Sequence, residues 1–282
     1  MSMFSSGLSY EPYVGRWSRM VAPELLRWLA VDHGARWLDV GCGTGALTSA
    51  ILAMANPQSI TSIDRSAAFL AHARTLINDP RVTFQAGDAQ ALPVDDESFD
   101  ATVSGLMLNF LPDPDRGMAE IARATRVGGT VGIYVWDYAG GMEMMRIFWD
   151  AATALDPDAV AHDEGNQYSS LCHPDELERR FSAAGMTDVA TRPIDIPTVF
   201  RDFDDYWSPF LGAQGTAPAY VATLDADRRD ALRDRLRAAV PFSNDGSIRL
   251  TARAWAARGV VGEGQGDADS SVPYVPVATR MC

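Results

Sequence analysis

The chain contains no lysine among its 282 residues, so all 24 of its basic residues are arginines. This absence excludes a catalytic lysine, a Schiff base and the phosphate-binding lysine of a Walker-type loop. Cysteine is scarce too: Cys42, Cys172 and Cys282 are far apart and form no CxxC pair. Neither a disulfide framework nor a cysteine-rich metal centre is therefore expected, and a reducing, cytoplasmic location is predicted.

Long apolar runs and excess positive charge are also missing. No apolar run approaches the length of a membrane span, and residues 1–10 lack the apolar core of a signal peptide. The formal net charge is −13, with 37 acidic residues against 24 basic ones. A chain this acidic is a poor general binder of phosphate backbones, so neither a membrane nor a nucleic acid is expected as partner.

What the chain does contain is a regular alternation of apolar strand patterns and amphipathic helix patterns up to residue 137. Strands are predicted at 36–40, 59–63, 82–85, 99–104 and 130–136, and helices at 46–54, 67–77 and 115–125. Gly128 and Gly129 are expected to close the last of these helices. Strands that alternate with helices predict an α/β fold with a doubly wound, parallel sheet.

The rhythm changes after residue 138. A helix is predicted at 174–184, strand six at 186–194, a surface helix at 225–240 and a period-two strand at 247–258. The predicted organisation is an N-terminal helical cap at 1–33, a cofactor-binding core at 34–137, a substrate lid with the last strands at 138–260 and a mobile tail at 261–282.

The most informative segment is a glycine-rich turn at residues 38–45, Leu-Asp-Val-Gly-Cys-Gly-Thr-Gly. Glycine allows positive φ and lets a ligand approach the bare backbone. Asp39 lies near the carboxyl edge of the predicted sheet, where open α/β sheets bind ligands. Asp64 follows Gly45 by 64 − 45 = 19 residues, where an acid can accept from ribose hydroxyls. The loop alone fits two ligands, because Gly41, Gly43 and Ala46 also satisfy the dinucleotide fingerprint.

Two further segments decide between these ligands. Residues 87–93 read Gly-Asp-Ala-Gln-Ala-Leu-Pro, and residues 95–100 read Asp-Asp-Glu-Ser-Phe-Asp. Together with the glycine loop and the segment 103–114, they resemble the class I S-adenosylmethionine-dependent methyltransferases, specifically the small-molecule, type 11-like family. The resemblance implies a doubly wound, mostly parallel seven-stranded sheet, the Rossmann-like methyltransferase fold, with a helical lid. It also implies S-adenosylmethionine as the cofactor, whose sulfonium cation suits carboxylates and aromatic faces.

The resemblance assigns a set of residues to the cofactor. Asp88 and the Ala89 backbone would hold the adenine amino edge. Tyr10 would lie over the site, and Arg16 or Arg19 could pair with the methionine carboxylate. The whole predicted cofactor-binding set is Tyr10, Arg19, Asp39, Gly41, Gly43, Asp64, Arg65, Asp88, Ala89 and Ser104.

The acceptor side is predicted from position and residue type. The predicted substrate pocket consists of Trp136, Asp137, Tyr138 and Trp149, because small-molecule sites are mostly apolar with few polar groups. Gly140 and Gly141 are expected to act as a hinge for the lid. Methyl transfer needs a base only if the acceptor must lose a proton first, and no histidine is placed to act as one, so the catalytic residue is unknown. No metal-ligand spacing is present, so no metal is predicted.

The predicted function is transfer of a methyl group from S-adenosylmethionine to a small-molecule acceptor whose identity the sequence leaves open. Residues 104–107 lack the Asn/Asp-Pro-Pro-aromatic motif of relatives that methylate adenine or glutamine amides. Two alternatives stay open, an NAD-dependent oxidoreductase and a catalytically inactive cofactor-binding protein. The oligomeric state is also open.

Overall fold

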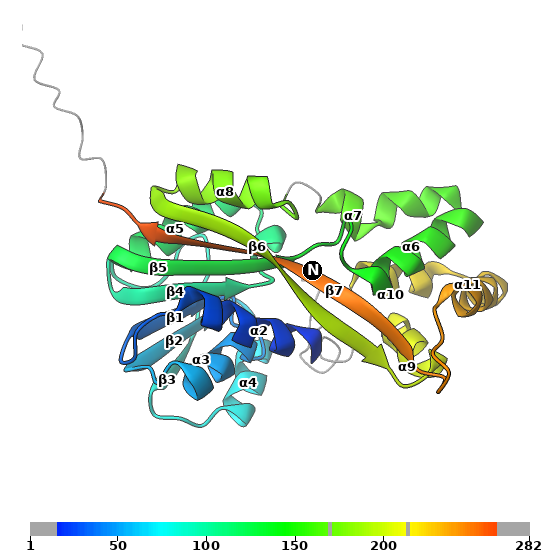
Figure 1. Cartoon of the computed structure of the whole chain (residues 1–282), viewed down its shortest axis with the longest axis horizontal. Coiled ribbons are helices and arrows are strands. Elements are labelled where there is room, and N and C mark those ends of the chain that lie inside the picture. The colour runs from blue at the N-terminus through cyan, green and yellow to red at the C-terminus, as the bar shows by residue number, and fades with distance from the viewer. Residues whose placement is uncertain (1–15, 169–170, 213–214, 264–282) are drawn as a thin grey trace, which may run out of the picture.

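The computed structural model describes residues 16–168, 171–212 and 215–263. In this part of the chain seven strands form one sheet, in the order β3-β2-β1-β4-β5-β7-β6 (Figure 1). The strands are β1 (Arg36–Val40), β2 (Ser59–Asp64), β3 (Val82–Ala86), β4 (Phe99–Gly105), β5 (Thr125–Trp136), β6 (Met186–Phe200) and β7 (Ile248–Val261).

The described helices flank this sheet and surround the part of β6 and β7 that extends beyond the other strands (Figure 1). The α-helices are α2 (Arg16–Leu29), α3 (Ala46–Met54), α4 (Ala67–Leu76), α5 (Pro114–Ala124), α6 (Glu143–Leu155), α7 (Glu164–Gln167), α8 (Pro174–Ala183), α9 (Phe203–Trp207), α10 (Thr216–Thr223) and α11 (Ala226–Ala239). Three short 3-10 helices are η2 (Leu108–Phe110), η3 (Pro157–His162) and η4 (Ser208–Leu211).

The predicted doubly wound architecture is confirmed. Strands β1 to β5 pair in parallel, and β7 is antiparallel to both β5 and β6. One apolar cluster packs α2 and α3 on one face of the sheet, with Leu25 and Ile51 fully buried. A second cluster packs α5 and α8 on the other face, with Ile121 and Phe181 fully buried. Burial on both faces explains why the strands read as apolar runs in the sequence.

One predicted boundary is wrong. The sequence predicts that the glycine pair ends a helix before a strand at 130, whereas β5 begins at Thr125 and runs through both glycines. Gly128 has φ +73, and the register with β4 shifts between Phe99 and Ala101. A Cβ at Gly129 would lie 2.8 Å from the Arg126 carbonyl oxygen. The glycines therefore form an irregularity inside the strand, because only glycine fits the local backbone.

Strands β6 and β7 are longer than predicted and build the second half of the molecule. Their pairing continues from Ile194 opposite Ala254 to Phe200 opposite Ile248, past the end of β5 at Trp136. Helices α6, α9, α10 and α11 gather around this ribbon at the right of Figure 1. Strand β7 reaches Val261, the first residue assigned to the tail; the rest of that prediction, from 264 on, lies outside the described residues.

Helix α2 is clamped onto the sheet by a tryptophan between two arginines. The guanidinium carbons of Arg192 and Arg258 each lie 5.0 Å from the Trp28 ring centroid. Arg258 also donates to the Trp28 carbonyl oxygen at 2.8 Å. On the same helix, the Ser18 hydroxyl lies 3.2 Å from the hydroxyl of Tyr134 on β5. These contacts hold both ends of α2 against the sheet, and Ser18, at the N-terminal end of the helix, lies at the edge where the parallel strands end.

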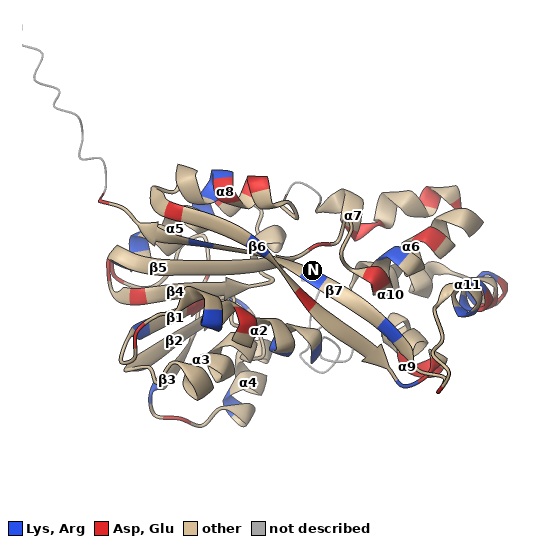
Figure 2. Cartoon of the chain, in the orientation of Figure 1, with Lys and Arg blue, Asp and Glu red and all other residues tan. Residues whose placement is uncertain are grey.

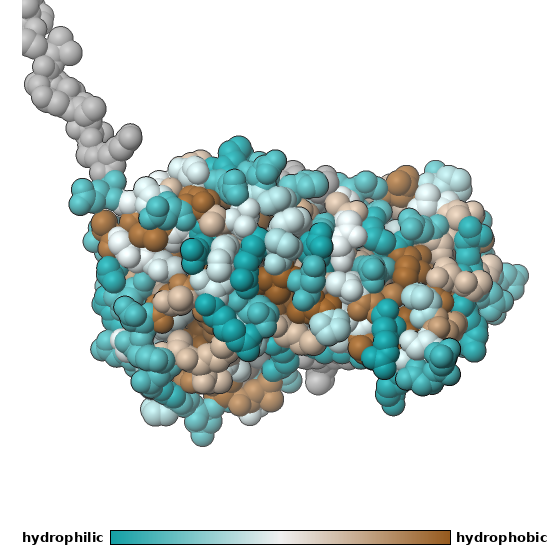
Figure 3. Space-filling view, viewed as in Figure 1, coloured by the Kyte–Doolittle hydropathy of each residue, from teal (hydrophilic) through white to brown (hydrophobic). Residues whose placement is uncertain are grey.

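Charges of both signs are interleaved on the surface. Acidic and basic side chains alternate along α8 and α11 (Figure 2), which agrees with ion pairs such as Arg179–Glu176 and Arg180–Glu176. In Figure 3 hydrophilic residues cover much of the visible face, with apolar residues showing between them. None of the described helices is both long and apolar enough to cross a membrane.

Candidate functional site

The loop between β1 and α3 is shaped by glycines with left-handed backbone. Gly41, Gly43 and Gly45 have φ of +71, +52 and +87, which side chains rarely adopt. A Cβ at Gly41 would collide with the side chain of Met107. A Cβ at Gly43 would meet no atom of the described residues within 4 Å. The loop is therefore packed against its neighbour at Gly41 and open to a ligand at Gly43.

Asp64, the last residue of β2, ties this loop to the start of α4. Its Oδ2 accepts from the Gly43 backbone N–H at 2.9 Å, and its Oδ1 accepts from the Ser66 N–H at 2.8 Å. Burial raises the pKa of Asp64, and these two hydrogen bonds oppose that shift. Each carboxylate oxygen keeps a lone pair for a ligand, because an ionised carboxylate can accept about four hydrogen bonds.

Asp39 lies on β1 with no exposed surface. Its Oδ2 accepts from the Thr48 hydroxyl at 2.6 Å, and that hydroxyl lies 2.8 Å from the Ser62 hydroxyl. Its Oδ1 has no hydrogen-bond partner among the described residues. Burial raises the pKa of Asp39 to about 7, because a charged carboxylate is costly in a low dielectric; the hydrogen bond from Thr48 opposes the shift, and the charge of Asp64 adds to it.

The chain after β4 forms the opposite wall. Leu106 has φ +60, a conformation that is strained for a non-glycine residue and concentrates at functional sites. Its N–H donates to the Tyr134 carbonyl oxygen at 2.8 Å. Asn109, on η2, is only 6% exposed, and neither polar atom of its side chain has a hydrogen-bond partner among the described residues.

These segments enclose a cavity of about 540 Å³ at the carboxyl ends of the parallel strands. Its lining residues are Ser18, Asp39, Gly41, Cys42, Gly43, Thr44, Ala46, Leu47, Asp64, Arg65, Ser66, Phe69, Gly105, Leu106, Met107, Asn109, Phe110, Leu111, Pro112, Tyr134 and Tyr168. One side carries the glycine loop and the two carboxylates, and the other side is apolar and aromatic. Such a cavity has the size and character of a small-molecule site.

Half of the predicted cofactor-binding residues line this cavity: Asp39, Gly41, Gly43, Asp64 and Arg65. The other predicted residues are placed differently. Ser104 is fully buried just before the lining residue Gly105, with no partner for its hydroxyl in the described part of the chain.

Asp88 and Ala89, after β3, are outside the lining; Asp88 is exposed, and its Oδ1 accepts from the Gln90 N–H at 2.9 Å. Arg19 is exposed on α2 and also does not line the cavity, and Tyr10 lies outside the described residues.

None of the four residues predicted for the substrate pocket lines the cavity. Trp136 and Trp149 are 1% exposed and belong to the apolar core, and Trp149 donates its indole N–H to Glu164. Asp137 accepts from the Gly140 N–H through its Oδ1 at 3.0 Å. Tyr138 contacts Tyr168, which does line the cavity, with ring centroids 5.9 Å apart.

The predicted hinge and lid receive no support from the packing. Backbone hydrogen bonds hold Gly141 on both sides, from its N–H to the Asp137 carbonyl and from the Arg253 N–H to its own carbonyl. In α6 the side chains of Met145 and Phe148 have no exposed surface. The helix therefore packs as part of the core in this structure.

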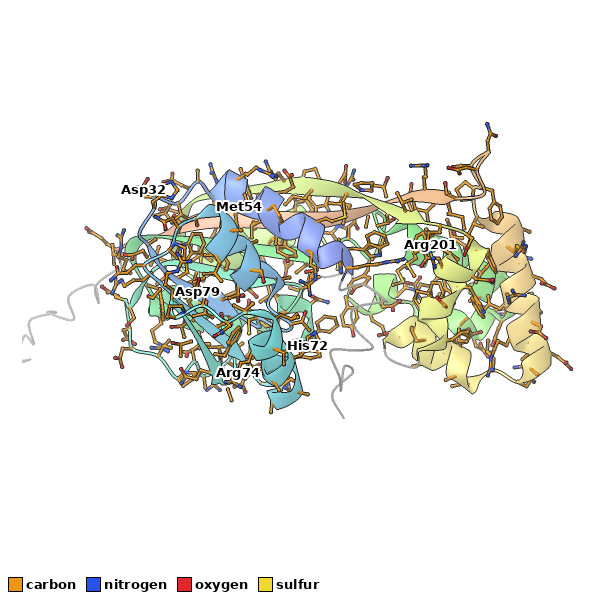
Figure 4. All side chains as sticks on the ribbon, turned by 90° about the horizontal axis from the view of Figure 1, so that it is seen from below. Asp32, Met54, His72, Arg74, Asp79 and Arg201 are labelled. Carbon is orange, nitrogen blue, oxygen red and sulfur yellow. The ribbon has the colours of Figure 1, made fainter. Side chains whose placement is uncertain are left out.

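The residues that the sequence did not single out lie mainly on the apolar wall. Phe110 and Tyr168 contact each other edge to face, with centroids 5.3 Å apart. Asn109 and Tyr134 come from η2 and β5. The sequence signal for Asn109 and Phe110 is their position shortly after strand four, at the edge where ligands bind, whereas Tyr134 lies inside strand five and Tyr168 follows α7. Figure 4 labels His72 on α4; it is half-buried and does not line the cavity.

Comparisons with known proteins show that the chain is similar to methyltransferases. The family model described as a methyltransferase domain matches residues 38–133. The chain is 32% identical over 228 residues to the methyltransferase GfsG of Streptomyces halstedii, which covers 77% of each chain. It is 31% identical over 170 residues to a demethylmenaquinone methyltransferase of Roseiflexus castenholzii, covering 57% of this chain and 71% of that protein.

A shorter match joins the chain to a larger plant protein. It is 39% identical over 94 residues to 2-methyl-6-phytyl-1,4-hydroquinone methyltransferase 2 of Oryza sativa, which covers 33% of this chain and only 27% of the rice protein. Among solved structures, the YcgJ protein from Bacillus is similar over 88% of this chain and all of its own, with a TM-score of 0.57 and 17% identity.

A phosphoethanolamine N-methyltransferase of Haemonchus contortus is similar over 90% of this chain and 58% of its own, with a TM-score of 0.57 and 18% identity. These two structures support the fold alone.

Proposed function

We propose that this chain, which belongs to the type 11 family of class I S-adenosylmethionine-dependent methyltransferases, methylates a small, largely apolar acceptor. The acceptor would bind in the cavity at the carboxyl ends of β1, β2 and β4. The observation that carries the proposal is one cavity with two chemically different sides. The glycine loop with Asp39 and Asp64 forms the first, and the wall with Leu106, Phe110 and Tyr168 forms the second.

The donor set fits S-adenosylmethionine. The cofactor carries an ammonium group and a sulfonium cation, and the first side of the cavity offers two carboxylates. The free Oδ1 of Asp39 is a buried acceptor without a partner in the described chain, so a cationic donor there would remove an unfavourable state. Two carboxylates in this place would repel the pyrophosphate of a dinucleotide, which disfavours the oxidoreductase alternative.

Each remaining part of the cofactor has a matching group. Asp64 is held by two backbone N–H donors and can accept from ribose hydroxyls. The N-terminus of α3, capped by Gly45 without a side-chain hydrogen bond, presents backbone donors for the methionine carboxylate. Arg65 and Phe69 line the cavity beside Asp64 and can contact the adenine ring. The predicted roles of Arg19, Asp88, Ala89 and Ser104 remain proposals.

The cofactor, when bound, supplies a methyl group whose bond to sulfur breaks as an acceptor lone pair attacks it, leaving a neutral thioether. The protein contributes placement, which can supply about 7–11 kcal/mol in favourable cases. Leu106 and Phe110 give the acceptor an apolar surface, and Tyr134 lines the cavity with its hydroxyl close to that of Ser18. A proton lost by the acceptor passes to solvent, because Asp39 and Asp64 both face the cofactor side.

The wider setting is also a proposal. Residues 34–137 form the cofactor half, while the segment from 138 to 260 supplies Tyr168 to the acceptor side. A reducing cytoplasm suits Cys42 and Cys172, which are both buried free thiols. The acidic net charge of −13 makes nucleic acid an unsuitable acceptor.

Isothermal titration calorimetry with S-adenosylhomocysteine, S-adenosylmethionine and NAD tests the cofactor. Binding of the first two and not of NAD is the expected result. A screen of small acceptors, read out by release of S-adenosylhomocysteine, then separates an active enzyme from an inactive binding protein. Binding of NAD alone would overturn the proposal.

A further inference from the structure

The side chain of Asn109 is a buried carboxamide that has no hydrogen-bond partner in the described part of the chain. The residue is 6% exposed, and both Oδ1 and Nδ2 are buried without a hydrogen-bond partner among the described residues. Buried polar groups in native proteins are nearly always paired, and leaving one unpaired is unfavourable. Asn109 is therefore expected to gain partners when the cavity is filled.

Among the described residues, two that line the cavity carry buried polar side-chain atoms without a hydrogen-bond partner. Of the described residues that line it, Asp39 and Asn109 are the ones whose side chains keep buried polar atoms without a partner. Asp39 is on the side of the glycine loop, where the cofactor's cation is proposed to bind. Asn109 lies on η2 between the apolar Leu108 and Phe110, and Phe110 contacts Tyr168. Asn109 thus belongs to the acceptor side.

We propose that Asn109 positions the acceptor by hydrogen-bonding one of its hydroxyl groups, so that the acceptors of this protein are apolar molecules that carry a hydroxyl next to the reacting atom. This inference rests on the function proposed above and narrows its substrate class.

The chemistry of the carboxamide selects a hydroxyl. Asn109 offers one acceptor atom and one amino donor on the same planar group. A hydroxyl can donate to Oδ1 and accept from Nδ2 at the same time. An ammonium group can only donate and a carboxylate can only accept, so either would leave half of the carboxamide unpaired. A site built to bond a hydroxyl rejects analogues that lack it, because its own buried polar atoms are then left unsatisfied.

Asn109 is a positioning residue in this proposal. A carboxamide does not ionise in the physiological range, so it takes no proton from the acceptor and its selection is independent of pH. The surrounding wall of Leu106, Leu111 and Tyr168 excludes water and strengthens the hydrogen bonds to the hydroxyl.

The test compares two probes of similar shape, 1-naphthol and 1-methylnaphthalene, which differ by a hydroxyl in place of a methyl group. Binding of each is measured by quenching of tryptophan fluorescence with the protein saturated by S-adenosylhomocysteine. The wild-type protein should prefer 1-naphthol by at least ~10-fold, the scale of paired against unpaired buried polar groups. Asn109→Leu keeps a similar volume and should lose this preference, with its affinity for S-adenosylhomocysteine unchanged within about twofold.

Thr198→Val is the matched control, because the Thr198 hydroxyl is also buried without a partner among the described residues but lies on β6, outside the cavity lining. It should keep the preference for 1-naphthol. Asn109→Ala provides a second variant should Asn109→Leu fail to fold, and it too should lose the preference.

The outcomes separate this inference from the proposed function. A wild-type protein without preference, or an Asn109→Leu variant that retains it, overturns the role of Asn109 while cofactor binding stands. A tenfold loss of S-adenosylhomocysteine affinity in Asn109→Leu assigns the carboxamide to the cofactor and also overturns it. A wild-type protein that binds neither S-adenosylmethionine nor S-adenosylhomocysteine refutes the proposed function itself.

Discussion

Cofactor affinity should rise with pH through the ionisation of Asp39, and this prediction follows from the geometry of one buried carboxyl group. Asp39 has no exposed surface, its Oδ2 is bonded to Thr48 and its Oδ1 is unpaired in the described chain. Burial raises its pKa to about 7. The ammonium group of S-adenosylhomocysteine attracts the ionised form, so a proton must leave Asp39 before or during binding.

The magnitude follows from the fraction ionised. With a pKa of about 7, roughly one carboxyl in eleven is ionised at about pH 6 and roughly three in four at about pH 7.5. If only the ionised form binds, affinity should increase about eightfold over this interval, or ~1.3 kcal/mol. Asp39→Asn should bind more weakly at both values and lose most of the pH dependence.

Titration calorimetry in two buffers of different ionisation enthalpy measures both quantities. At about pH 6 the wild-type protein should release close to one proton for each S-adenosylhomocysteine bound. Asp79→Asn is the matched control: Asp79 is a half-buried loop carboxylate outside the cavity lining, labelled in Figure 4, whose partner Arg81 lowers its pKa to about 2. That variant should keep the wild-type profile. Equal wild-type affinity at both pH values, without proton release, would refute the reasoning.

Asp39 also makes the stability of the ligand-free protein depend on pH. Its contribution to stability should fall as pH rises, whereas its contribution to cofactor affinity should increase. The pKa of Asp39 is raised above the value of about 3.9 expected in the unfolded chain. Its contribution to stability is therefore complete below about pH 4 and is lost as pH rises through about 7. The melting temperature of the ligand-free protein should fall less over this range in Asp39→Asn than in the wild type. Identical slopes in the two proteins would contradict this assignment.

Three further predictions concern the loop and the proposed lid. Asp64→Ala should weaken S-adenosylhomocysteine binding by about 1.5–3 kcal/mol, the scale of hydrogen bonds to a charged group; unchanged calorimetric affinity with an intact fold would remove Asp64 from the site. Gly43→Val should abolish binding because its side chain would enter the open space beside the loop, whereas Gly34→Val, equally strained at φ +81 and outside the cavity lining, should bind normally. Because backbone hydrogen bonds already hold Gly141 and Met142, hydrogen exchange should show these two residues equally protected with and without cofactor and acceptor, as Phe148, fully buried in α6, should also be; added protection at Gly141 and Met142 on binding would instead indicate a moving lid.

The alternation of strands and helices was predictable because its causes are local. Each core strand is a short apolar run, and β7 follows the predicted period of two, with Ile248 and Leu250 buried and Arg249 exposed. The left-handed backbone at Gly41 and Gly43 was likewise expected from residue type, since it occurs at positions that only glycine fills easily.

Lengths and irregularities were less accessible. No local sequence pattern indicates that β6 continues to Phe200. The last residues of β6 pair with β7, and Ile248, the partner of Phe200, lies 48 positions further along the chain. The sequence predicts that Gly128 and Gly129 end a helix, but they lie inside β5, because residues on either side of them, Thr125 and Thr130, pair with β4. In both cases strand partners distant in sequence override the local pattern.

The residues of the candidate site also fall into those that local sequence patterns predict and those that depend on contacts between distant elements. The sequence by itself determined the carboxylates Asp39 and Asp64 and the glycine loop, because these lie at the ends of predicted strands in a recognisable order. Only the tertiary structure decided which residues form the wall proposed for the acceptor. In the structure Trp136 and Trp149 are part of the core, and Asn109, Phe110 and Tyr168 line one cavity. A sequence motif consists of residues that are close together in the chain. The wall of a cavity instead consists of side chains from distant elements. They line the cavity because they are left without a packing or hydrogen-bonding partner once the core is filled.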